Sequence, residues 1–300
     1  MSDSKTTLAQ ISTFLALRHP GLLADLSALE GNSASNPDET LQQLINFFGL
    51  NFHQKLASLV IERVRRDLSN AIAETFNWVI KYGPFAGMKL LRSSWWGEGD
   101  KASIVFGLYE QEVAKELLDL SKKFKTFIDI GAADGYYGVG MVCCGYVEKS
   151  ICYEISEAGQ KVIAELAVLN NCSDRVKVRA EAKKNFLAEV TAAGEPNALI
   201  LIDIEGAEFD LLDDAQLEQI RNCAVIVEIH DFIVSDGKSK YENFLERCEK
   251  HFDLKRVTTT NRDLSIFPEL DTFSDHARWL LASEGRGQRM HWLIMTPKNL

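Results

Sequence analysis

Residues 127–138 decide the fold: they are Phe127-Ile128-Asp129-Ile130-Gly131-Ala132-Ala133-Asp134-Gly135-Tyr136-Tyr137-Gly138. The apolar run at 127–130, with one acid near its end, is typical of a parallel strand buried on both faces. Gly131, Ala133 and Gly135 remove side-chain bulk where the chain must bend, so a ligand there can touch bare backbone. A buried strand that runs straight into a small-residue turn predicts a site for a nucleotide-like cofactor.

A second apolar strand ends in an acid about twenty residues further along, a spacing typical of dinucleotide-binding folds. It is Ser150-Ile151-Cys152-Tyr153-Glu154. A carboxylate at Glu154 can accept hydrogen bonds from the two hydroxyls of a ribose. The turn and this acid together predict a nucleoside site.

The composition of the chain favours one well-buried domain with a smaller appendage. Its 300 residues are 46% hydrophobic and carry a formal net charge of −10. A negative chain disfavours a general nucleic-acid binder, because a phosphate backbone is attracted by clustered Lys and Arg. We therefore expect a small-molecule or glycan acceptor and no nucleic acid. The sequence opens without a basic-then-apolar leader and has no apolar segment of membrane-spanning length, so we predict a cytoplasmic protein.

The cysteines show no metal-type CxxC spacing. Several sit inside apolar runs, where a thiol behaves as a small hydrophobe. They are Cys143, Cys144, Cys152, Cys172, Cys223 and Cys248. We expect them to be reduced and structural.

Residues 1–82 form a predicted N-terminal helical region. Between 51 and 81 apolar residues recur at every fourth position, which predicts one long amphipathic helix; they are Phe52, Leu56, Val60, Val64, Leu68, Ile72, Phe76 and Ile80. Such a stripe needs a partner surface. It could pack on the core or on a shorter helix expected at about 38–48, or it could form a homo-oligomer with the same helix of another subunit.

Residues 83–106 are rich in glycine and aromatic residues, which suits a connecting or lid segment. Flanking glycines supply hinges, and the adjacent Trp95 and Trp96 could cover a substrate site or stack on a sugar ring. The same two side chains could instead fill the seam between two lobes.

Residues 107–300 alternate strand and helix patterns, which predicts right-handed βαβ crossovers and an α/β, doubly wound, Rossmann-like sheet. We expect seven strands near 124–130, 149–154, 175–180, 197–204, 223–230, 252–259 and 289–296. The helices expected between them include 139–144, 160–169, 211–220 and 240–251. The last two strands should form an antiparallel pair at the sheet edge.

The segment from 105 to 296 resembles the class I S-adenosylmethionine-dependent methyltransferases, and within them the FkbM-type family. Four features of the sequence support this resemblance. They are Asp129-Ile130-Gly131-Ala132-Ala133-Asp134-Gly135, the acid Glu154, Leu201-Ile202-Asp203-Ile204-Glu205-Gly206-Ala207-Glu208 and Val225-Ile226-Val227-Glu228-Ile229-His230. Asp134 stands where the family often has Asn. The resemblance implies the strand order 3-2-1-4-5-7-6 with the last strand antiparallel, and S-adenosylmethionine as cofactor above the carboxyl ends of the central strands.

The cofactor-binding residues that follow from the turn, the ribose acid and the resemblance are Asp129, Gly131, Ala132, Ala133, Gly135, Glu154, Glu181, Ala182, Asp203, Tyr109 and Glu110. Glu181 and Ala182 would lie at the adenine, and Tyr109 and Glu110 at the methionine end. Each acid has a structural alternative: Asp129 could bind only the turn amides, Glu181 could be an exposed loop acid, and Glu110 could simply begin a helix. Glu208 similarly suits the first turn of a helix.

The predicted catalytic residues are His230, Asp203 and Glu228. An alcohol is a weak nucleophile and gains from a base, and His230 is the best-placed titratable group, with Asp203 or Glu228 to orient it. Alternation along two strands would put Asp203 with Glu205, and Glu228 with His230, on common faces; that argument fails for Glu205 if its strand ends at Asp203.

Two alternatives to this base remain open. Asp203, Glu205 and Glu228 could hold a divalent metal that acidifies the hydroxyl, although metal-free chemistry is favoured. His230 could also be a satisfied structural imidazole. Near the acceptor, Arg286 would suit an anionic substrate group.

The sequence thus predicts an S-adenosylmethionine-dependent O-methyltransferase, a transferase for a hydroxyl of a carbohydrate or sugar-containing small molecule. A nicotinamide-dependent oxidoreductase is one alternative, but 131–138 lacks G-x-G-x-x-G. The other is a nucleoside-binding, catalytically silent scaffold that assembles through its N-terminal helices.

Overall fold

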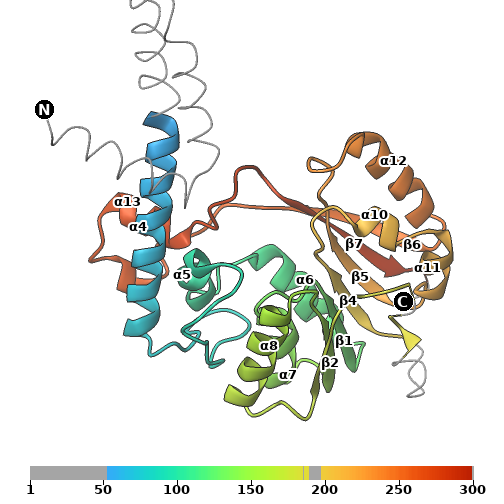
Figure 1. The fold of residues 1–300 in the computed structure, drawn as a ribbon, viewed down its shortest axis with the longest axis horizontal. Helices are drawn as coiled ribbons and strands as arrows, with labels where there is room; N and C mark the ends of the chain where they lie inside the picture. Colours follow the sequence, from blue (N-terminus) through green and yellow to red (C-terminus); the bar gives the residue numbers. More distant parts are fainter. Residues whose placement is uncertain (1–52, 185, 189–196, 299–300) are drawn as a thin grey trace, which may run out of the picture. The chain divides into compact units, whose positions relative to one another are not determined.

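The computed structural model describes residues 53–184, 186–188 and 197–298 (Figure 1). The chain divides into two compact units, Met1–Arg63 and Val64–Leu300. Of the first unit only 53–63, the beginning of helix α4 (His53–Thr75), is described. The short helix expected at 38–48 lies outside the described residues.

The second unit is built on a seven-stranded sheet in the order β3-β2-β1-β4-β5-β7-β6. Its strands are β1 (Thr126–Ile130), β2 (Lys149–Tyr153), β3 (Val176–Arg179), β4 (Leu199–Ile202), β5 (Ala224–Glu228), β6 (Phe252–Thr258) and β7 (His291–Pro297). The first five strands pair in parallel, and β7 runs antiparallel to both β5 and β6. The predicted order and the antiparallel last strand are confirmed.

The helices of the second unit lie between these strands and before the sheet. They are α5 (Lys101–Val105), α6 (Gln111–Ser121), α7 (Tyr136–Cys143), α8 (Glu157–Leu169), α10 (Glu208–Leu211), α11 (Asp214–Gln219), α12 (Gly237–Cys248) and α13 (Asp275–Ala282), with 3-10 turns at Glu98–Asp100 and Pro268–Leu270. Among the described residues no helix has both the length and the apolar character needed to span a membrane.

Two predicted helices differ from the observed ones. The predicted single helix at 211–220 is two, because the Asp213 side chain accepts a hydrogen bond from the Gln216 amide and begins α11 anew. The helix predicted to run to 81 ends at Thr75, because Asn77 and Trp78 adopt left-handed φ angles of 53° and 58°. The apolar repeat continues past the end of the helix to Ile80. Ile80 is buried next to the short β-bridge between Val79 and Lys89, and not on the face of a helix.

Both faces of the sheet are covered (Figure 1), because the strand residues alternate between two hydrophobic clusters. Phe127 and Leu201 face one cluster, with apolar residues of α6, α7 and α8. Ile128 and Ile202 face the other, with those of α10, α11 and α12. The carboxyl ends of the central parallel strands lie side by side, and ligands bind at this edge in doubly wound sheets.

Candidate functional site

A cavity of about 740 Å³ opens at the carboxyl ends of β1, β2, β4 and β5. This volume is in the usual range for small-molecule sites, about 300–1,000 Å³. The predicted residues that line it are Trp95, Trp96, Tyr109, Glu110, Asp129, Gly131, Ala132, Ala133, Glu154, Glu181, Ala182, Asp203, Glu205 and Glu228. Gly135, His230 and Arg286 do not line it directly.

The turn after β1 is a backbone cradle. The amides of Gly131 and Ala132 both donate to the Tyr153 carbonyl, at 2.9 and 3.0 Å. Gly131 has a φ of +87°, and a Cβ atom there would meet the Asp203 carbonyl oxygen at 1.7 Å. Only glycine fits this position, because the conformation is left-handed and the β4 chain leaves no room.

Asp129 has the hydrogen bond to the turn that the structural alternative predicted, and its contact with a cofactor stays a prediction. It lines the cavity, and its Oδ2 accepts a hydrogen bond from the Gly138 amide at 2.8 Å. Burial raises the pKa of this carboxyl to about 7. Asp129 therefore fixes the turn whether or not it also contacts a ligand.

Glu154 is held beside the turn by two backbone amides. One carboxylate oxygen accepts from the Ala133 amide at 2.9 Å and the other from the Ser156 amide at 2.8 Å. Each oxygen keeps a further lone pair for a donor in the cavity. A fixed acceptor next to a turn without bulky side chains, both lining the cavity, suits the ribose and amino-acid portions of an adenosyl cofactor.

The segment before α5 is fastened to the same turn. The Trp95 amide donates to Asp134 at 3.0 Å, its indole Nε1 donates to the Ala133 carbonyl at 3.0 Å, and the Ser94 hydroxyl also bonds Asp134. Trp95 and Trp96 both line the cavity, so this segment borders the site. The lid role predicted for it stays a prediction.

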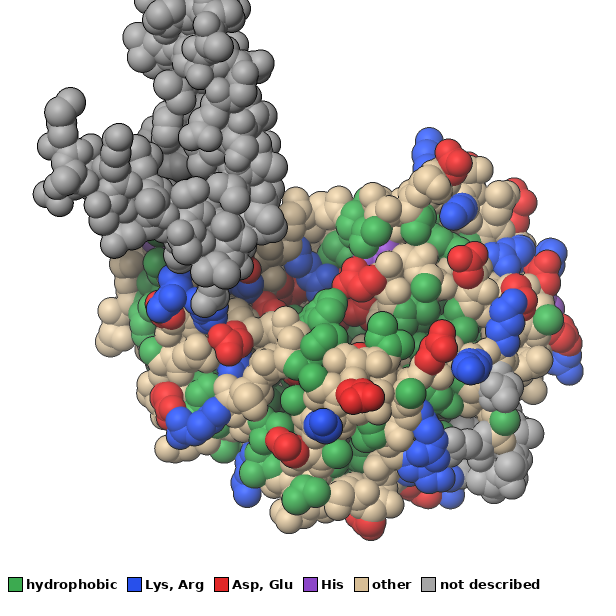
Figure 2. All heavy atoms as spheres, in the orientation of Figure 1, with side chains coloured by type: hydrophobic (Ala, Val, Ile, Leu, Met, Phe, Trp, Pro, Cys, Tyr) green, Lys and Arg blue, Asp and Glu red, His purple; other side chains and the backbone are tan. Residues whose placement is uncertain are grey.

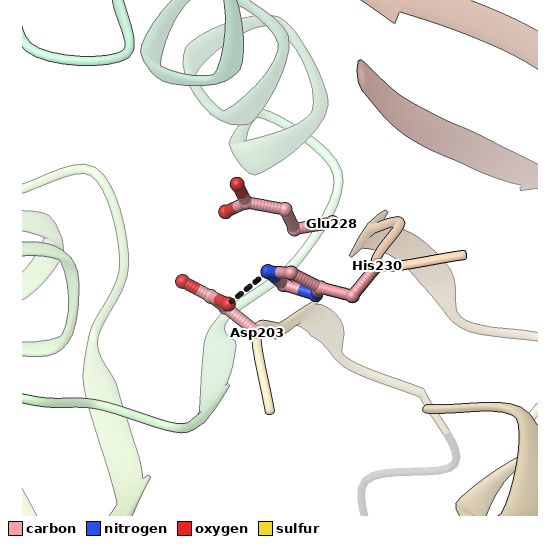
Figure 3. Close-up of side chains that lie close together, drawn as sticks. All are labelled: Asp203, Glu228 and His230. Carbon is pink, nitrogen blue, oxygen red and sulfur yellow. Dashed lines mark ion pairs between the residues drawn. The ribbon is translucent and has the colours of Figure 1, made fainter. Parts of the chain in front are cut away.

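Three predicted catalytic side chains converge beside the cavity (Figure 3). Asp203, Glu228 and His230 each offer a ligand or acceptor atom, and these atoms lie within 4.8 Å of one another. The His230 Nε2 atom lies 3.7 Å from Asp203 and 3.5 Å from Glu205. The cation alternative of the sequence named Asp203, Glu205 and Glu228, whereas the described cluster contains His230 in place of Glu205.

This convergence does not come from strand alternation. β4 ends at Ile202 and β5 at Glu228, so Asp203, Glu205 and His230 all lie beyond their strands. Glu205 has a left-handed φ of 51°. The predicted approach of Glu228 and His230 is observed. Strand alternation does not explain it, because the turns after β4 and β5, and not the pleat, direct Asp203, Glu205 and His230.

Glu208 holds His230 in place. Its fully buried carboxylate accepts from the His230 backbone amide at 2.8 Å and lies 3.2 Å from the ring Nδ1. Burial lowers the pKa of His230, but the bond to Glu208 and the charge of Glu228 outweigh it, so the pKa is raised overall. Burial and the charge of Glu228 raise the pKa of Asp203 well above its ordinary value.

Arg286 joins the acids of the site. Its Nη1 donates to Glu228 at 2.6 Å and its Nε to Glu284 at 2.8 Å, and its Nη2 pairs with Glu110. Glu110 also accepts from the Tyr137 hydroxyl at 2.7 Å. Burial and the Glu228 charge nevertheless raise the pKa of Glu110 to about 8. The anionic-substrate role of Arg286 stays a prediction, and its guanidinium already pairs with three carboxylates.

Sequence reasoning missed several contacts of this site. Ser94, Tyr137 and Glu284 were not singled out, and Glu208 was given either a helix-start or a cofactor role, with no contact to His230. Glu208 does begin α10, but its contacts are with His230. The one available signal was Asp134, whose departure from the family pattern coincides with its bonds to Ser94 and Trp95.

A doubly wound sheet of this order, with a glycine cradle and an acid at the end of β2, defines the class I methyltransferase fold. Residues 129–287 match the methyltransferase FkbM domain. The chain belongs to this family and is an S-adenosylmethionine-dependent methyltransferase. The nicotinamide alternative is thereby not supported.

Solved structures of similar fold include two O-methyltransferases. One, from Bacillus cereus in complex with SAH, is 15% identical, with 61% of this chain and 80% of that chain covered and a TM-score of 0.41. The other, a putative enzyme from Klebsiella pneumoniae, is 16% identical with the same coverages and a TM-score of 0.42. Cofactor-bound Rv0187 from MTB is 15% identical, with 62% and 80% covered and a TM-score of 0.41. No curated protein matches the chain.

Proposed function

We propose that the protein transfers the methyl group of S-adenosylmethionine to a hydroxyl of a carbohydrate or sugar-containing small molecule. The observation that carries this proposal is the orientation of His230. Its Nδ1 faces the Glu208 carboxylate, which can only accept, so the neutral ring carries its proton there. Nε2 is then the free base, on the side of Asp203 and the cavity.

The residues proposed to hold the cofactor are the turn Gly131, Ala132, Ala133 and Gly135 with Asp129, the ribose acid Glu154, the adenine neighbours Glu181 and Ala182, and Tyr109, Glu110 and Asp203 at the methionine end. When bound, S-adenosylmethionine supplies an activated methyl group on a sulfonium. The protein then mainly has to align an acceptor oxygen behind that methyl carbon.

The acids and the imidazole divide the remaining work. Asp203 and Glu228 line the cavity and accept hydrogen bonds from acceptor hydroxyls. His230 takes up the proton that the attacking hydroxyl loses, and Asp203, which lines the cavity beside it, passes that proton on. Glu208, which is fully buried, stabilises the imidazolium that results.

The charge at this end of the cavity favours a neutral polyhydroxylated acceptor. Asp203, Glu205 and Glu228 offer acceptor oxygens and repel an anion. The cation Arg286 is already paired with three glutamates. A sugar carries several hydroxyl groups, and each can donate one hydrogen bond to an oxygen of these carboxylates.

The test is an assay with methyl-labelled S-adenosylmethionine and paired acceptors, each neutral sugar beside its uronic acid or sugar phosphate, read by mass spectrometry. We expect label on the neutral member and at least about tenfold less on its charged partner. Affinity for S-adenosylhomocysteine is measured separately by calorimetry. Binding without transfer to any acceptor would favour the silent scaffold instead.

The same assay with a chelator distinguishes a general base at His230 from a divalent cation as the group that activates the hydroxyl. The close grouping of Asp203, Glu228 and His230 also suits a hard divalent cation, which would acidify the hydroxyl. The proposal expects unchanged transfer after chelation. Loss of transfer that added Mg²⁺ or Mn²⁺ restores would assign these residues to a metal.

A further inference from the structure

A second cavity lies away from the methyl-transfer site and shares no lining residue with it. Its volume is about 520 Å³. It is walled by residues 83–84 and 86–89, by the end of α7 and by the turn after α8, and both Cys143 and Cys144 line it. Its position is independent of the proposed acceptor chemistry.

We propose that Cys143 and Cys144 form a vicinal dithiol site that binds a thiophilic centre, a soft metal ion or trivalent metalloid, bridged by both sulfurs. Their Sγ atoms lie 3.7 Å apart. A soft centre is the preferred partner of thiolate ligands. Once one sulfur has bound the centre, the second binds it within the same complex. The second bond therefore adds to the affinity without a further loss of translational entropy.

These two cysteines differ from the other four. Cys152, Cys172, Cys223 and Cys248 are fully buried in the core clusters, in agreement with the structural role expected from the sequence. Cys143 and Cys144 are only partly buried and face an open cavity. The hydrogen bond between the two thiols lowers the pKa of Cys144 and raises that of Cys143, so Cys144 is the thiolate that reacts first.

A bridging ligand suits this pair better than a disulfide. Neighbouring Cα atoms are about 3.8 Å apart across a trans peptide, and a relaxed disulfide needs about 4.4–6.8 Å. The chain has no cis peptide bond among the described residues. A centre inserted between the sulfurs avoids this strain because it lengthens the bridge.

The cavity walls are fixed before any ligand enters. The Asn170 side chain bonds both the amide and the carbonyl of Lys89, at 2.8 and 2.9 Å. The Tyr146 hydroxyl donates to the Pro84 carbonyl at 2.8 Å. A preformed site loses less entropy when a ligand binds.

Phenylarsine oxide is the first probe, and its reaction with the pair is balanced. Two arsenic–sulfur bonds form, both thiol protons leave with the arsenic-bound oxygen as water, and nothing is oxidised or reduced. The phenyl carbon supplies the third bond to arsenic. Cuprous ion, competed with a chelator, is the second probe and tests the metal source of the same chemistry.

The experiment compares the full-length wild type with Cys143→Ser and Cys144→Ser by intact-mass spectrometry. We expect one arsenical per wild-type chain, and removal from it should need about 100-fold more competing monothiol than removal from either variant. The adduct should protect two of the six thiols from iodoacetamide, and the four core thiols should react only after unfolding. Thermal melting checks that each variant is folded, and either one alone suffices.

The proposal would be overturned if the same monothiol concentration removed the arsenical from the wild type and from a folded variant, and if cuprous ion bound both proteins with equal affinity. It would also be overturned by a native protein that simply loses two mass units on mild oxidation, because a disulfide would then be the favoured state. Methyl transfer is not a readout of this experiment, so its result does not depend on the proposed function.

Discussion

The cavity has two halves that are built by different means. The half beside β1 and β2, the turn half, consists of the backbone at 131–135 and the carboxylate of Glu154, which backbone amides hold. The half beside β4 and β5, the charged half, consists of Asp203, Glu228 and His230 with the partners that hold them. One half depends on the absence of side chains and the other on their charges.

This difference predicts which kind of substitution damages each half. A backbone cradle is lost when a side chain is added, while a charged cluster fails when one member is removed and its neighbours stay buried. On the face of the described residues drawn in Figure 2, Lys and Arg side chains are interspersed with Asp and Glu, without a continuous basic stripe. We expect the strong effects from substitutions inside the cavity.

His230→Ala should give the largest effect and should separate the two halves. Loss of a general base lowers kcat by about 10²–10⁴-fold, while affinity for S-adenosylhomocysteine, a property of the turn half, should not change. In the wild type kcat should rise with pH through the pKa of His230, which lies above the ordinary 6.5, because the free base forms there. The exposed His276→Ala is the control. Equal kcat in the two variants would exclude the base.

Gly131→Ala should damage the turn half itself. The left-handed φ of +87° and the overlap with the Asp203 carbonyl should cost at least about 3 kcal/mol of unfolding free energy. Gly145→Ala is the matched control, because Gly145 has a φ of +79° but open space around it and should cost only about 1–2 kcal/mol. Denaturant unfolding measures both. Similar losses would show that the close approach of β4 is not what requires glycine.

Arg286→Met should damage the charged half, since it leaves Glu110 and Glu228, which are 3% and 1% exposed, without their cation. We expect a loss of about 3 kcal/mol at pH 8. The folded-state pKa of Glu110 lies above its unfolded value, so stability falls as pH rises from 4.5 to about 8. The variant should therefore recover toward pH 5. Arg286→Lys should be intermediate, and a pH-independent loss would argue for packing alone.

Glu154→Ala should reverse the pattern of His230→Ala. Loss of a charged acceptor is worth about 1.5–3 kcal/mol, so the Kd for S-adenosylhomocysteine should rise about 10–100-fold. The exposed Glu157→Ala at the start of α8 is the control. Calorimetry gives both values. A Kd unchanged by Glu154→Ala would remove this residue from the nucleoside site.

Trp95→Phe should give the smallest effect. It removes the indole bond to the Ala133 carbonyl and keeps an aromatic ring, for a loss of about 1 kcal/mol or a roughly fivefold higher Kd. Trp279→Phe, whose ring is exposed, is the control. Fluorescence titration measures both. A larger effect on kcat than on Kd would place Trp95 with the acceptor.

The two halves also differ in how far the sequence predicted them. The turn, its strand and Glu154 are close in the chain, and glycine at Gly131 reports a local backbone requirement, so they could be read directly. Glu208 was placed correctly at the start of a helix, but its contact with His230 could not be read. Asp203 and Glu205 were assigned to a strand that ends before them.

The sequence by itself determined the buried strands and the glycine cradle, because short-range patterns of apolar and small residues specify them. Its resemblance to the FkbM-type family, and not those patterns, implied the strand order. Only the tertiary structure decided the ion pairs of Arg286 with Glu110, Glu228 and Glu284, since these residues come from distant parts of the chain. It also separated the paired, accessible Cys143 and Cys144 from the four core thiols. Charge and exposure depend on which segments meet in space, and a pattern along the chain does not record that.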